Sequence, residues 1–158
     1  MAVTYTLNQT TPLPIKGQPS SGYTLNTQEA AIDPASTSVI VGGTAVVISG
    51  NAGGQSLVDK AAADDLIDGF VKYDPTYNGG DYTIMAGKQV TLLVEGSVMV
   101  MEVGASAVTA GDQVEIVATG DLIIPSAGTN TIVGIALTDG ATGDLIPVRI
   151  KIIIPPAA

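Results

Sequence analysis

A mainly β protein is predicted, built as a compact antiparallel barrel or sandwich of the jelly-roll or tulip-like type with an extended N-terminal arm. From residue 39 onward, short β-branched and aliphatic runs are separated by glycine turns at intervals of roughly 8 to 12 residues, which is typical of sandwiches and barrels. Within several runs apolar side chains alternate with polar ones. Each such strand therefore has one face for a core and one for solvent.

Residues 1–38 differ from the rest and are predicted to form the arm. Pro12, Pro14, Pro19 and Pro34 interrupt a stretch rich in Thr, Ser, Gln and Asn, in which apolar residues are isolated. Such a stretch cannot build a core, but its short alternating pieces suit extended backbone laid over another surface. The predicted division is an arm at 1–38, a β domain at 39–154 and a C-terminal tail at 155–158.

Strands in the β domain are predicted from the alternation of apolar and polar residues. In the last of them Val148, Ile150 and Ile152 share one face, whereas Arg149 and Lys151 share the other. The predicted strands are 39–41, 44–49, 69–73, 82–85, 89–95, 97–103, 113–118, 121–124, 131–137 and 145–154. Residues 59–68 hold at most a turn or two of helix, because their alanines favour helix and their acids suit its first turn.

One motif occurs twice in the β domain. Residues 86–96 and 110–120 both begin Ala-Gly-x-Gln-Val and end in glycine, and residues 43–48 are a looser third copy. The first glycine permits a turn at positive φ, and the aliphatic side chains three and five positions later point into the core. We interpret the motif as the entry into a strand. A phosphate-binding loop would need GxxxxGK followed by Ser or Thr, which is missing here.

The composition excludes several classes of function. The 158 residues include no Cys and no His, which removes thiol nucleophiles, Cys/His zinc sites and imidazole-based triads. The 15 acids and 6 bases give a net charge of −9, so too few cations are present to neutralise a phosphate backbone. Neither a signal peptide nor the ~20 apolar residues of a membrane span are evident. We expect a soluble, unexported protein with no cofactor, no metal, no nucleic-acid partner and no membrane partner.

Acidic residues beside glycines form three groups, at 64–68, 74–81 and 139–144. None has the spacing of an EF-hand loop, and Asp next to Gly is typical of an ordinary turn. The turn interpretation is favoured over a low-affinity calcium site. Glu95 and Glu102 offer a carboxylate pair, but no aromatic sugar platform accompanies them.

Apolar and aromatic residues in three places are candidate contacts with partners. Those of the arm stand isolated between prolines, and we expect them to reach a neighbouring molecule. A tyrosine in the loop KYDPTYNGGDY combines a large ring with a polar tip, which suits interfaces. Three consecutive isoleucines end the last strand and require burial on both faces, within this domain or against another chain. The candidates are Tyr5, Leu7, Leu13, Ile15, Tyr23, Leu25, Tyr77, Ile152, Ile153 and Ile154.

The order of these segments resembles that of the structural cement, or head decoration, proteins of tailed bacteriophages. The similarity covers roughly residues 40–152, and the arm has no comparable match. It rests on GTAVVI (43–48), VDKA (58–61), DGFVKYDP (68–75), AG (86–87) with its strand, EGSVMVME (95–102), AGDQV (110–114), TIVGIALTDG (131–140) and GDLIPVRI (143–150).

The resemblance implies a non-enzymatic protein that binds the outer surface of a phage capsid and stabilises contacts between capsomers. Its partner would be the phage major capsid protein, and it would act as a homo-oligomer, a dimer or a trimer. Its location would be the capsid surface of the virion, after synthesis in the host cytoplasm. The alternative is a glycan- or calcium-binding β module of a fibre or adhesin.

Overall fold

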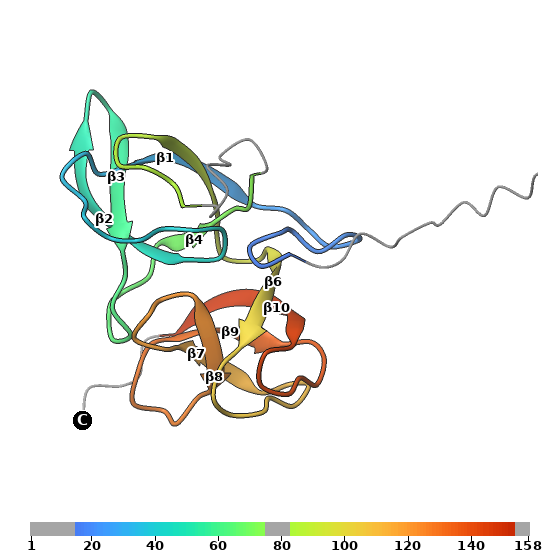
Figure 1. The fold of residues 1–158 in the computed structure, drawn as a ribbon. Helices are drawn as coiled ribbons and strands as arrows, with labels where there is room; N and C mark the ends of the chain where they lie inside the picture. Colours follow the sequence, from blue (N-terminus) through green and yellow to red (C-terminus); the bar gives the residue numbers. More distant parts are fainter. Residues whose placement is uncertain (1–14, 75–82, 154–158) are drawn as a thin grey trace, which may run out of the picture.

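The computed structural model describes residues 15–74 and 83–153, and within them the chain is all β. The predicted mainly β class is confirmed. The strands of these residues form two closed barrels of five strands each rather than one. Figure 1 shows the first barrel, coloured blue to yellow-green, above the second, coloured yellow to red.

Barrel 1 contains the first five strands in the order β1-β3-β2-β4-β5. Strands β1 and β3 are parallel, and the other pairs are antiparallel. The strands are β1 (Thr27–Ile32), β2 (Ala45–Ala52), β3 (Gln55–Lys60), β4 (Gly69–Val71) and β5 (Gln89–Leu93).

Barrel 2 contains the last five strands in the order β10-β6-β8-β7-β9. Strands β6 and β8 are parallel, and the other pairs are antiparallel. The strands are β6 (Val98–Val103), β7 (Gln113–Ile116), β8 (Leu122–Pro125), β9 (Ile132–Ala136) and β10 (Leu145–Ile153).

The two barrels have the same topology, with β6 to β10 in the places of β1 to β5. Their registers also correspond: Ile32 of β1 pairs with Val58 of β3, and Val103 of β6 pairs with Ile123 of β8. Turn hydrogen bonds follow the same scheme. The N–H of Gly43 donates to the carbonyl of Val71 (2.7 Å), as the N–H of Gly111 donates to that of Ala136 (2.8 Å). The molecule is therefore one barrel unit built twice in tandem.

Two apolar clusters hold this arrangement together. One fills barrel 1 and comprises Ala30, Ile32, Ile40, Val46, Val58, Val71, Ile84, Val90 and Leu92. The other fills barrel 2 and continues onto the outer face of barrel 1 through Ala45, Ala61, Ile67, Phe70 and Leu93. Because these five side chains are buried, the contact between the barrels is itself part of the core.

The repeated motif opens strands as predicted. Gly87 and Gly111 have φ of 78° and 93°, and β5 and β7 begin two residues after them. The third copy leads into β2, the strand equivalent to β7. In β2, Ile48 was expected to point into the core, but it is 47% exposed. The register of β2 against β3 shifts between Ile48 and Gly50.

Other local predictions were wrong. Residues 27–32, within the predicted arm, form β1, and β3 was not predicted. Residues 59–68 are not helical: the first two end β3, and the carboxylates of Asp65 and Asp68 accept the N–H groups of Ala62 and Ile48 (both 2.7 Å). Acids used in this way stabilise turns and extended backbone instead of a helix. Residues 39–41 are not a strand, although Ile40 is buried, and the predicted strand 82–85 lies partly outside the described residues.

Candidate interaction surfaces

Residues 16–20, which we call the clasp, lie against both barrels. The N–H of Gly17 donates to the carbonyl of Val100 in β6 (2.8 Å), and the carbonyl of Gly17 accepts from the N–H of Tyr73 (2.9 Å). Further along, the N–H of Ser20 donates to Val98, and the N–H of Val100 donates to Gln18 (both 2.9 Å). The clasp therefore pairs with β6 through an antiparallel β-bridge, Pro19 opposite Met99, and also ties β6 to barrel 1. Figure 1 shows it in blue beside the junction of the barrels.

Glycine is required where the clasp crosses barrel 1. Gly17 has a φ of 82°, and a methyl group there would lie 2.3 Å from the nitrogen of Gly43 and 2.5 Å from the carbonyl carbon of Gly42. Such distances are far inside van der Waals contact. The backbones of the clasp and of the turn before β2 approach closely because none of these three residues carries a side chain.

An ion pair anchors the start of the clasp to barrel 2. The Lys16 ammonium lies 2.8 Å from Asp121, just before β8, and 3.7 Å from Glu102 of β6. Burial tends to raise the pKa of Asp121. The hydrogen bond from Lys16, another from Thr119 and the charges of Lys16 and Lys60 outweigh burial, so the pKa lies below its ordinary value. The carboxylate therefore stays charged and holds Lys16.

Predicted contact residues flank the clasp and are open to solvent. Ile15 precedes it and is 40% exposed, whereas Tyr23 and Leu25 follow it and are 47% and 51% exposed. Ile152 and Ile153 of β10 are half-buried, and Ile152 packs against the core cluster of barrel 2. The remaining candidates, Tyr5, Leu7, Leu13, Tyr77 and Ile154, lie outside the described residues.

The structure adds exposed apolar side chains that the sequence did not single out. Val39, Leu66 and Met85 are more than half exposed. Leu66 stands in an acidic stretch, DDLID, where the local pattern gives no sign of a surface site. It borders an open groove of about 410 Å³ lined also by Gln28, Ile67, Asp68, Val94, Glu95 and Ile152. The groove thus brings the predicted Ile152 together with residues of barrel 1.

Acidic side chains next to glycines serve as caps of turns. Asp112 and Asp144 accept the N–H groups of Thr109 and Ala141, three residues earlier, at 2.9 and 2.8 Å. Asp139 accepts the N–H of Ala110 at 2.8 Å. The contact of Asp144 confirms the turn interpretation for that residue of the group at 139–144. Within the described part of the chain, no group of three or more Asp and Glu side chains is placed to hold a metal ion.

One carboxylate that the sequence did not single out is buried. Glu115 of β7 is 2% exposed and accepts hydrogen bonds from Asn130 (3.0 Å) and Ser126 (3.3 Å). Both donors belong to the turn between β8 and β9. Glu115 therefore fixes that turn against the barrel wall.

No helix in residues 15–74 and 83–153 has the length and apolar character of a membrane span.

The protein consists of two β-barrels that are joined by a shared core and a clasp. Its distinctive features are surfaces for contact, among them the exposed apolar residues. The chain belongs to a family of phage structural proteins, because the family model described as "Structural cement protein (E217 gp24/Pam3 gp6)" matches residues 3–151. No curated protein sequence matches the chain.

A solved structure with a similar fold is the crystal structure of the head fiber gp8.5 N base in bacteriophage phi29. It superposes with a TM-score of 0.55 at 15% sequence identity, over 81% of this chain and 95% of that one. At this level of identity the likeness concerns the fold.

Proposed function

We propose that this protein binds the outer surface of a phage capsid as a homo-oligomer and stabilises contacts between capsomers. The observation that carries the proposal is membership of the structural cement family over residues 3–151. Membership of a structural family also supports a role without catalysis. The fold that the chain shares with a head fiber base from another phage is consistent with attachment to a head.

The physical mechanism is thermodynamic linkage. A protein that binds the assembled shell more tightly than loosened capsomers stabilises the shell by the difference between the two affinities. An interface of about 1,600 Å² is sufficient for a specific complex, and several contacts in one oligomer add through effective concentration. A rigid body suits this task, and the core shared by the two barrels provides one.

Exposed apolar residues beside the clasp are the proposed capsid contacts. Tyr23 and Leu25 are about half exposed, so substitution there removes contact surface without opening the core. Isolated apolar groups of this kind become anchors when a partner covers them.

The test is binding to capsids that lack this protein, measured by co-sedimentation and by the temperature at which the shell disrupts. We expect the protein to co-sediment in saturable amounts and to raise that temperature. The variant Tyr23→Ser/Leu25→Ser should bind at least about 10-fold more weakly, a loss of about 1.4 kcal/mol. Met85→Ser, at an exposed residue outside the proposed contact, should bind like wild type. Absence of binding by the wild-type protein would contradict the proposal.

A further inference from the structure

The equivalence of the two barrels breaks down at one strand edge. In barrel 2, the side of β6 that faces away from β10 is covered at residues 98–100 by the clasp. The equivalent residues of barrel 1 are Thr27, Gln28 and Glu29, because Thr27 pairs with Leu93 of β5 as Val98 pairs with Arg149 of β10. On its other side β1 pairs with β3 only at Ala31 and Ile32, so no strand of the described residues covers 27–29 there.

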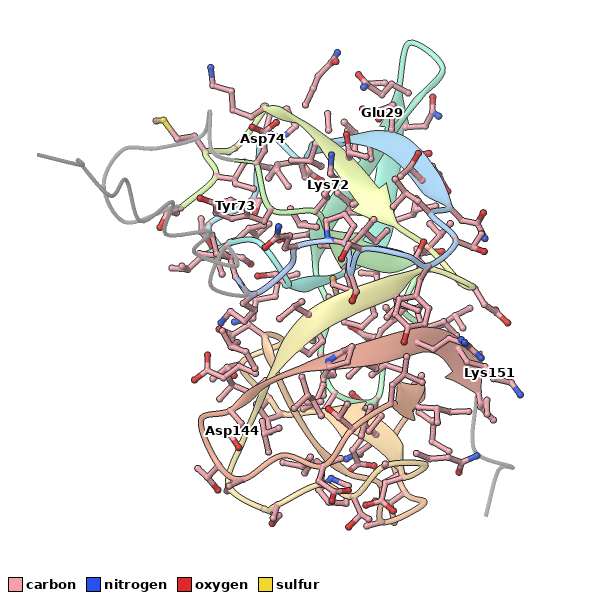
Figure 2. All side chains as sticks on the ribbon, turned by 90° about the vertical axis from the view of Figure 1, so that its right-hand side faces the viewer. Glu29, Lys72, Tyr73, Asp74, Asp144 and Lys151 are labelled. Carbon is pink, nitrogen blue, oxygen red and sulfur yellow. The ribbon has the colours of Figure 1, made fainter. Side chains whose placement is uncertain are left out.

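The uncovered edge presents backbone groups in the arrangement that the clasp uses on β6. There, Val98 accepts one hydrogen bond, and Val100 donates one and accepts another. The equivalent groups are the carbonyl of Thr27 and the N–H and carbonyl of Glu29. All three residues of the edge are exposed, and Figure 2 shows Glu29 on the outside of barrel 1. An unpaired strand edge of this kind is a template for an added strand.

We propose that residues 3–7 of a second copy of this chain add to the edge of β1 as an antiparallel strand, with Tyr5 opposite Gln28. In barrel 2 the equivalent central pair is Pro19 opposite Met99, flanked by the bonds from Ser20 to Val98 and from Val100 to Gln18. The proposal concerns self-association, so it can fail while capsid binding is observed, and the reverse.

Three features of the N-terminal segment favour this occupant. The sequence of residues 3–7, VTYTL, favours a strand, in which Val3, Tyr5 and Leu7 would share one face. Residues 1–14 include no charged side chain, so they approach a protein of net charge −9 without repulsion between carboxylates. The third feature is the spacer that follows.

Prolines favour a second copy, rather than the same chain, as the source of the strand added to β1. A residue before proline favours extended backbone, so the sequence Thr11-Pro12-Leu13-Pro14 predicts a stiff, extended spacer before the clasp. A stiff spacer disfavours the reversal that would return residues 3–7 to β1 of their own chain. Exchange of arms between identical copies satisfies the edge of each copy and closes a symmetric assembly.

Gln28, at the centre of the uncovered edge of β1, lies beside an apolar surface. Gln28 lines the groove that contains Leu66, Val94 and Ile152. Opposed residues of an antiparallel pair point to the same side of the sheet, so Tyr5 opposite Gln28 is directed to this groove. Tyrosine would bury its ring there and keep its hydroxyl in water.

Cysteine pairing tests the proposal directly, since the natural chain has no cysteine. A non-hydrogen-bonded antiparallel pair has a Cα separation of about 4.5 Å, within the range of a disulfide. Under mild oxidation, Gln28→Cys/Tyr5→Cys should form disulfides between chains, seen on a non-reducing gel as species of twice the chain mass or more. The control Asn51→Cys/Tyr5→Cys, with a cysteine at an exposed residue of the β2–β3 hairpin, should remain mostly uncrosslinked. A disulfide within one chain, or crosslinking no greater than in the control, overturns the proposal.

Hydrogen exchange provides a test without cysteines. In the full chain the amide of Glu29 should exchange about 100-fold more slowly than in a variant that lacks residues 1–8, while the amide of Leu92 in the core of barrel 1 is unchanged. The truncated variant should also sediment as a smaller species. Equal exchange at Glu29 in the two proteins overturns the proposal.

Discussion

Barrel 1 and barrel 2 share one pairing scheme but fill their interiors differently. Met101 of β6 occupies in barrel 2 the interior position that Ala30 of β1 occupies in barrel 1. In the same way, Gly140 of barrel 2 is equivalent to Ile84 of barrel 1. A methyl group on Gly140 would lie 2.7 Å from the side chain of Ile146, so a larger residue there would force its neighbours to shift. Large and small side chains have been redistributed around the same backbone. The comparison teaches that this barrel requires a filled interior rather than a particular residue at each position.

The barrels also differ at their first strands. The clasp covers the edge of β6, and its equivalent at β1 is uncovered among the described residues. The clasp has two roles: it covers the edge of β6 at residues 98–100 and contacts barrel 1 through Gly17. Substitutions that separate these roles show how far the two halves depend on each other.

The largest effect is expected at the clasp. Gly17→Ala combines positive φ with a clash against backbone, and the two costs together should lower the free energy of unfolding by about 4 kcal/mol. Gly22→Ala is the matched control, because Gly22 has a φ of 85° but a methyl group on it would have nothing within 4 Å. Its cost should be about 1 kcal/mol. Denaturant unfolding measures both, and equal costs would show that the close approach does not matter.

The interior of barrel 2 should respond next. Met101 is 1% exposed, and Met101→Ala leaves a cavity that should cost about 3 kcal/mol. Met85→Ala, the same substitution at a side chain that is 70% exposed, should cost less than about 0.5 kcal/mol. If Met101→Ala were as mild as its control, barrel 2 would tolerate the small residue that barrel 1 carries at Ala30.

A pair of equivalent glycines compares the two barrels directly. On Gly134 of β9 a methyl group would lie 2.5 Å from the carbonyl oxygen of Arg149, and on Gly69 of β4 it would lie 3.0 Å from that of Leu93. Gly134→Ala should therefore cost about 2 kcal/mol and Gly69→Ala about 1 kcal/mol. Thermal unfolding ranks the two, and the reverse order would mean that barrel 2 adjusts more easily than barrel 1.

The smallest effect is expected for the ion pair of the clasp. Lys16→Met should cost less than about 1 kcal/mol at neutral pH, since both partners are partly exposed. The pKa of Asp121 is lowered from 3.8, so the stability gained from its charge is present above that pH and is lost as the pH falls through the lower folded value. The difference in unfolding free energy between Lys16→Met and wild type should vanish in that acid range. A difference that persists there would show that the cost of Lys16→Met does not come from the charge of Asp121.

Local patterns predicted the strands whose side chains alternate clearly. In β10, Val148 and Ile150 are buried while Arg149 and Lys151 are exposed, as expected. Strands β1 and β3 escaped prediction because apolar and polar residues do not alternate in TQEAAI and QSLVDK. β1 is a strand because it pairs with β3 and β5, which both lie far away in the chain. β3 pairs with β1 in parallel and forms a hairpin with the adjacent β2.

For the candidate contacts, the structure shows exposure, and exposure was predicted in part. Exposure of Ile15, Tyr23 and Leu25 follows from their isolation between polar residues and prolines. Leu66 was missed because its exposure depends on the turn between β3 and β4, where Asp68 is engaged with Ile48 of β2. No local pattern reports that contact.

Composition and periodicity were sufficient to establish the β class, the glycine-led strand entries and the lack of thiol and imidazole chemistry, because these depend on residue types and on neighbours one to five positions apart. The doubling of the barrel was hidden, since the equivalence lies in strand pairing and hydrogen bonds while the side chains have diverged. The repeated motif even joins β5 to β7, which are not equivalent strands. Pairing partners, the position of the clasp and the uncovered edge of β1 depend on contacts between distant segments, and these form only when the chain closes on itself.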